Sequence, residues 1–213
     1  MGKLRKTILN DEQYLRQISQ EVDFSDKSYL DDIEKLREFC QTDGIFALAP
    51  VQIGIPKRII YLRSTNTDLN KTYDSNYDEN RILINPVIIR REGLTKFLEA
   101  CASCPDISAS SEEFDNKDNY LSCIVERPYL IEVEYYDVDG NKKTQIFKGF
   151  ESTVFSHEYD HLNGVLHIDL ASDIWPMNGN QRIEYRNKRP YQVISEDCDF
   201  DKEVAKNQSQ NIR

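Results

Sequence analysis

The stretch FSHEYDHLNGVLHID, residues 155–169, contains every histidine of this 213-residue chain. Its centre reads H-E-x-x-H, with His157 and His161 four residues apart. Residues at that spacing leave a helix from the same face, so both imidazoles can bind one metal ion. Glu158 is turned about 100° from His157 on such a helix and can reach a water molecule on the ion. The pattern predicts a metal-binding helix over 150–162.

The rest of the composition excludes several classes of protein. With 39% hydrophobic and 30% charged residues, the chain can bury the core of one soluble domain. The net charge of −10 repels phosphate backbones, so no direct nucleic-acid partner is expected. No signal peptide or membrane-spanning stretch is found, which predicts a cytoplasmic protein without a membrane partner. Five cysteines, an odd number, are interpreted as reduced thiols.

Other elements are predicted from periodicity and turn residues. Apolar residues at helical spacing before Gly44 predict a helix that ends at this glycine. ILINPVIIRR (82–91) is typical of a strand, and an Asp-Gly pair at 139–140 predicts a hairpin turn. Two polar stretches, 65–81 and 108–119, are predicted to be loops. The chain is polar and patternless from about Ala171, which predicts one domain over 1–170 and a polar tail over 171–213.

The third ligand is open on spacing alone. A catalytic ion takes three protein ligands and leaves one position for water. His167 completes the metzincin protease pattern H-E-x-x-H-x-x-G-x-x-H, with Met177 downstream. Cys101, on a strand facing the helix, offers a thiolate instead. Adding Cys104 would give a closed structural zinc site, although residues three apart on a strand point to opposite faces unless Pro105 bends the backbone.

Three segments together resemble the peptide deformylase family. LEACAS (98–103) is similar to the family's E-G-C-L-S, HEYDHLNGVL (157–166) to its H-E-x-D-H-L-x-G-x-L, and ALAPVQIGIP (47–56) to its G-φ-A-A-x-Q-φ-G loop. They occur in the family's order. The resemblance implies an α+β fold in which antiparallel β-sheets pack around a central helix that carries H-E-x-x-H.

The resemblance also implies a reaction, in which the N-formyl group is removed from the N-terminal formylmethionine of newly made polypeptides. The implied cofactor is Fe²⁺, for which Zn²⁺, Ni²⁺ or Co²⁺ can substitute. The implied partners are ribosome-associated nascent peptides. A metal-bound hydroxide attacks the formyl carbon, Glu158 acts as base and then acid, and donors hold the oxyanion. The ligands implied are Cys101, His157 and His161, and the donors are Gln52 and the N–H of Ala102.

Two of the residues that the resemblance implies for peptide binding depart from the family pattern. Phe46, Ala47, Ala100 and Arg127 are the peptide-binding residues that the resemblance implies. Alanine replaces glycine at 47 and 100, and each methyl group narrows the approach of a peptide backbone. A divergent relative with another substrate or little activity is therefore the alternative function. A metalloprotease and a closed zinc protein are the further alternatives, and His167 is interpreted as a packing residue.

Overall fold

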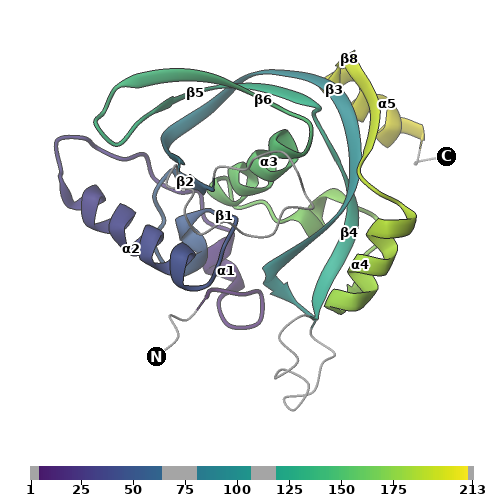
Figure 1. Ribbon diagram of the computed structural model, residues 1–213, viewed down its shortest axis with the longest axis horizontal. Coiled ribbons are helices and arrows are strands. Elements are labelled where there is room, and N and C mark those ends of the chain that lie inside the picture. The colour runs from purple at the N-terminus through teal and green to yellow at the C-terminus, as the bar shows by residue number, and fades with distance from the viewer. Residues whose placement is uncertain (1–4, 64–80, 107–118, 211–213) are drawn as a thin grey trace.

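The structure is a computed structural model that describes residues 5–63, 81–106 and 119–210. Helix α3 (Phe150–Leu162) lies at its centre, and antiparallel strands surround it (Figure 1). This arrangement confirms the predicted α+β fold. The predicted loops fall almost wholly at 65–80 and 108–118, outside the described residues. Within the described part of the chain, no helix combines the length and the apolar character needed to cross a membrane.

The remaining elements are shorter and alternate along the chain. The helices are α1 (Glu12–Leu15), α2 (Ser28–Thr42), α4 (Gly179–Lys188) and α5 (Phe200–Gln210), with 3-10 helices η1 (Pro50–Ile53) and η3 (His167–Leu170). The strands are β1 (Ala47–Leu48), β2 (Ile59–Leu62), β3 (Arg81–Pro105), β4 (Tyr120–Arg127), β5 (Leu130–Tyr136), β6 (Lys142–Lys148), β7 (Trp175–Met177) and β8 (Gln192–Asp199).

Strand β3 organises the sheet, because it continues for 25 residues and pairs with four other strands. Its first residues pair with β2, its middle with β5, and its last part with β8 and β4, all antiparallel. Gly93, at φ +71°, allows the chain to turn near the middle of the strand. The final residues of β3 are thereby carried to helix α3.

Helix α3 begins and ends as its sequence predicts. Its inner face packs on the sheet through Phe155, which is fully buried and whose ring stacks on Phe147 of β6 at a centroid distance of 5.0 Å. Glu158 and His161 of the same helix are also buried. The helix stops before Gly164, at φ +71°. Apolar packing thus fixes the rotation of the helix, and the rotation aims its polar residues inward.

Two further predictions are confirmed. Helix α2 buries Ile33, Leu36 and Phe39 against the sheet and is followed by Gly44 at φ +64°. β5 and β6 form the predicted hairpin, paired from Leu130 with Lys148 to Tyr136 with Lys142. The hairpin covers one side of α3 (Figure 1).

The polar segment after residue 170 contains β7, α4, β8 and α5. β7 pairs with β4, and β8 pairs with β3. The sequence gives little sign of these elements because their contacts use charged side chains, as in Arg182, which is buried with its guanidinium over the ring of Tyr120. The boundary between a domain at 1–170 and a tail at 171–213 stays a prediction.

The two helix-terminal glycines give a matched pair of substitutions. A Cβ at Gly164 would lie 2.1 Å from the carbonyl oxygen of Arg16, whereas a Cβ at Gly44 meets nothing within 4 Å. Gly44→Ala should lower the free energy of unfolding by about 1–2 kcal/mol, the cost of a left-handed non-glycine residue. Gly164→Ala should cost at least about 3 kcal/mol, because a backbone group must also move. Urea unfolding measures both, and equal losses would contradict the packing of Gly164 on Arg16.

Candidate metal centre

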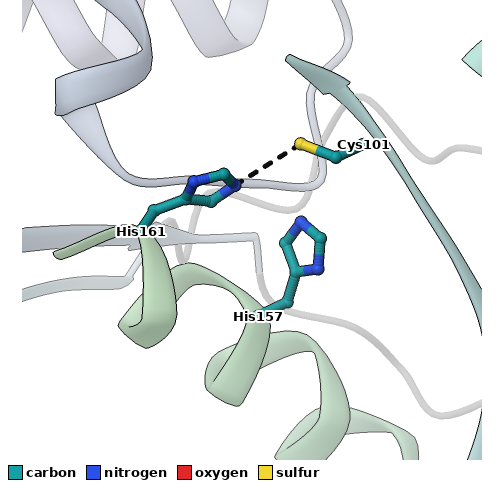
Figure 2. Close-up of side chains that lie close together, drawn as sticks. All are labelled: Cys101, His157 and His161. Atoms are coloured by element: carbon teal, nitrogen blue, oxygen red, sulfur yellow. Dashed lines mark hydrogen bonds between the residues drawn. The ribbon is translucent and has the colours of Figure 1, made fainter. Parts of the chain in front are cut away.

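Three side chains from two elements converge beside α3. Cys101 comes from β3, and His157 and His161 come from successive turns of α3 and point toward the sulfur (Figure 2). One ligand atom from each lies within 4.8 Å of the other two, and Cys101 Sγ is 3.4 Å from His161 Nε2. The imidazoles leave the same helix face, as their spacing predicts.

The donor set fits a divalent transition metal. One sulfur and two imidazole nitrogens suit zinc or iron, and ligands about 2.0–2.3 Å from a tetrahedral ion lie roughly 3.5 Å apart. The 3.4 Å between Cys101 and His161 agrees with that value. Buried His161 Nδ1 has no hydrogen-bond partner among the residues that the structure describes, so Nε2, facing the sulfur, is its nitrogen for a metal. Three protein ligands leave a fourth position for water.

A series of buried ion pairs supports the His157 ring. Glu99 Oε2 is 2.8 Å from His157 Nδ1, which orients the ring and directs Nε2 to the centre. Arg127 Nε and Nη2 donate to Glu99 at 2.8 and 3.0 Å, and Arg127 Nη1 donates to Asp160. Burial raises the pKa of Glu99, but the charge and hydrogen bonds of Arg127 outweigh it and hold that pKa well below the usual range.

Cys104 lies beside Cys101 without joining the ligand group. A hydrogen bond with Cys104 contributes most to a Cys101 pKa far below the usual value, and the charge of His161 adds to it. The same bond, with burial, raises the pKa of Cys104, so its thiol stays protonated. The register of β3 against β4 shifts between Ala100 and Pro105, so strand alternation does not hold there. Cys104 lies outside the ligand group that the described residues form, but strand alternation alone does not explain its position.

Glu158 of α3 lines the cleft beside the ligands. It is buried, and Oε2 accepts a hydrogen bond of 2.8 Å from the backbone N–H of Ala49. Burial raises the pKa of Glu158 above its usual value. A carboxylate with a raised pKa is suited to accept and return a proton near neutral pH.

Gln52, on η1, lies beside the sulfur of Cys101. Its Nε2 is 3.5 Å from Cys101 Sγ and 3.0 Å from Ser103 Oγ, and its Oε1 accepts from Ala49 N at 3.2 Å. These bonds fix which end of the amide faces the centre, with the donor end inward. Ser103 was not among the predicted site residues, although the LEACAS segment contains it.

A cleft of about 260 Å³ opens onto the centre. Ala100 and Ala102 of β3 line it, together with Phe46, Ala47 and Gln52 from the opposite side. The lining also includes residues that the sequence analysis did not single out, among them Phe97, Phe150, Arg5 and Arg186.

Two singled-out residues lie elsewhere. Arg127, predicted to bind peptide, is buried and engaged by Glu99 and Asp160, and it is absent from the cleft lining. It therefore holds Glu99, which in turn orients the His157 ring. His167 is buried, with Nε2 3.0 Å from the carbonyl oxygen of Leu121, and does not join the ligand group. The metzincin arrangement is not formed.

The chain is similar to known proteins over most of its length. The family described as polypeptide deformylase matches residues 5–175. A peptide deformylase from Pelagibacter ubique is 36% identical over 174 residues, covering 79% of this chain and 87% of the relative. A Plasmodium falciparum peptide deformylase solved with an inhibitor has a TM-score of 0.60 and 28% identity, covering 87% of this chain and 96% of that one. A Met-Ala-Ser-bound peptide deformylase from Acinetobacter baumannii, 21% identical, shares the fold at a TM-score of 0.62, covering 80% and 98%.

The support of His157 by Glu99 can be tested through metal affinity. Glu99→Gln removes the negative charge that orients the imidazole, so the affinity for Zn²⁺ should fall roughly 10–100-fold. Glu126→Gln is the control, since Glu126 pairs with Lys96 at 2.8 Å near the surface of the adjacent strand. Competition with a chromophoric chelator measures both, and circular dichroism checks folding. The same affinity in both variants would contradict the role of Glu99.

Proposed function

The chain belongs to the polypeptide deformylase family, and we propose from this premise that Cys101, His157 and His161 bind the metal ion with which it removes formyl groups from peptides. The observation that carries the proposal is the convergence of one thiol and two imidazoles within 4.8 Å at the cleft. The enzyme is a hydrolase of protein biosynthesis. Its products are formate and a free peptide N-terminus.

The substrate proposed is the N-terminal formylmethionine of nascent polypeptides. A relative of the same fold binds Met-Ala-Ser, the kind of peptide that deformylation leaves. Nascent chains of this kind emerge at the ribosome, and we place the enzyme there, in the cytoplasm. The apolar cleft walls, Phe97, Phe150 and Val154, are suited to an unbranched apolar side chain such as methionine.

The metal proposed is Fe²⁺, with Zn²⁺, Ni²⁺ or Co²⁺ able to replace it. When bound, the ion polarises the formyl carbonyl and acidifies a water molecule. The Cys101 thiolate is already favoured by its neighbours. A soft thiolate with two imidazoles binds any of these ions, so the site itself does not select among them.

The proton transfers are assigned to Glu158. Its carboxylate takes the proton of the attacking water and gives it to the departing α-nitrogen of the peptide, so no proton is lost to the solvent. The N–H of Ala49 holds the carboxylate at 2.8 Å and leaves its other oxygen for the reaction. The buried position and raised pKa of Glu158 favour both directions of transfer.

The developing negative charge on the formyl oxygen needs donors fixed in advance. Gln52 Nε2 and the backbone N–H of Ala102 are proposed for this role, from the two walls of the cleft. Gln52 is held by Ala49 and Ser103, so it turns little when a substrate arrives. Phe46, Ala47 and Ala100 are proposed to contact the peptide, and the methyl groups at 47 and 100 reduce the space for its backbone.

The ligand assignment can be tested by metal content. Cys101→Ser should lose most of the iron after anaerobic reconstitution and desalting, because a serine hydroxyl is a poor ligand for this ion. His167→Ala should keep it, since His167 lies outside the ligand group. Mass spectrometry of the metal measures both. X-ray absorption of the parent protein should show one sulfur and two imidazoles, and iron retained by the first variant and lost by the second would overturn the assignment.

The role of Glu158 can be tested separately from metal binding. Glu158→Gln keeps the shape but cannot accept a proton, so formate release from formyl-Met-Ala-Ser should fall roughly 10²–10⁴-fold while iron stays bound. The matched control is Glu151→Gln, a change on the same helix at a residue paired with Arg81. Near-normal turnover by the Glu158 variant would remove this residue from proton transfer.

A further inference from the structure

The C-terminal segment supplies part of the catalytic cleft. Helix α4 lies beside β4 (Figure 1), and its residue Arg186 is one of the cleft-lining side chains. Arg186 lies beyond residues 5–175, the part of the chain that matches the family. This wall therefore lies outside the residues that the family model covers.

Contacts between aromatic rings hold the C-terminal segment against the cleft. Tyr191, directly before β8, contacts the rings of Phe97 and Phe150, in each case at a centroid distance of 5.9 Å. The Tyr191 hydroxyl is 3.5 Å from Thr153 Oγ1, on α3. The guanidinium of Arg186 lies over the ring of Phe97, 4.8 Å from its centroid. These contacts keep Arg186 in place before a substrate binds.

The charge of Arg186 is not neutralised within the described part of the chain. Its Nε and Nη2 donate to the carbonyl oxygen of Leu98 at 3.2 and 2.9 Å. No carboxylate among the described residues lies within salt-bridge distance of the Arg186 guanidinium. Burial, followed by the positive charge of Arg182, lowers the pKa of Arg186, while the charge of Glu99 raises it. A guanidinium has five N–H donors, so several remain for a ligand.

The carboxylates of the cleft are engaged elsewhere. Glu99 is bound by Arg127 and His157, and Glu158 accepts from Ala49. The charge of Arg127, by contrast, is neutralised by two acidic partners. Arg186 instead presents a held, half-buried positive charge to a cleft built for a peptide. A peptide carboxylate is the group that would complement it.

We propose that Arg186 is a specificity-determining residue that binds a side-chain carboxylate of the substrate, so that formylated peptides with Asp or Glu soon after the first residue are preferred. The inference rests on the proposed deformylation. A neutral residue at that place in the peptide forms no ion pair with the Arg186 guanidinium, which then keeps its contacts with solvent and with Phe97. A basic residue meets it with like charge and is disfavoured.

The preference can be measured with isosteric peptides. The substrates are formyl-Met-Glu-Ala and formyl-Met-Ala-Glu with amidated C-termini, their Gln counterparts and their Lys counterparts. The iron-loaded parent enzyme should have a kcat/KM roughly tenfold higher for the better Glu peptide than for its Gln counterpart at low salt, the scale of one hydrogen bond to a charged group. Added salt should reduce this ratio.

Arg186→Gln should bring that ratio close to one, because kcat/KM falls mainly for the Glu peptides, and circular dichroism reports that the variant is folded. Arg186→Glu should favour the Lys peptides. Arg189→Gln removes the same charge from the end of the same helix, outside the cleft lining, and should keep the parent preference.

Three outcomes would overturn the inference: a parent enzyme with no preference for acid, a preference that survives Arg186→Gln, or an equal loss for all peptides in that variant. Formate release from none of the peptides by metal-loaded parent enzyme would instead refute the proposed function on which the inference rests.

Discussion

The pairing of Glu99 with Arg127 and His157 joins the three elements that make the centre. Glu99 is on β3, Arg127 on β4 and His157 on α3, and all of the bonds between them lie in the interior. Removing charges from water costs several kcal/mol for each ion unless every donor and acceptor is satisfied. Arg127 meets this condition by also donating to Asp160, one turn further along α3. The register of the strands and the rotation of the helix are therefore tied to one another by charge as well as by apolar packing.

Much of the centre could be predicted because its chemistry is local in the sequence. Both histidines and Glu158 are on one helix, whose period alone brings the imidazoles together. The hairpin and α2 follow from similarly local signals, an Asp-Gly turn and helical spacing. The third ligand required a long-range contact, so spacing left Cys101 and His167 as rivals. Only the resemblance to a family separated them before their positions were known.

The predictions that were wrong or incomplete concern irregular backbone and buried charge. Cys104 was expected to turn away from the metal by strand alternation; it lies outside the ligand group, but the register shift after Ala100 breaks the period on which that argument depends. The strand predicted at 82–91 is only the first part of β3, which continues through Gly93 to Pro105 with neighbouring strands paired along it. The C-terminal elements were missed because residues such as Arg186 pack through the stems and faces of charged side chains, which no hydropathy pattern records.

The long strand β3 has an edge that would be exposed without the C-terminal segment. Thr95 pairs with Arg127 of β4 and with Val193 of β8, so β8 covers the edge of β3 that β4 leaves open. An uncovered strand edge is a template for pairing with another chain, which leads to aggregation. During synthesis this edge stays open until residues 192–199 have been made. The last elements of the chain thus cover a strand edge that could otherwise pair with another molecule.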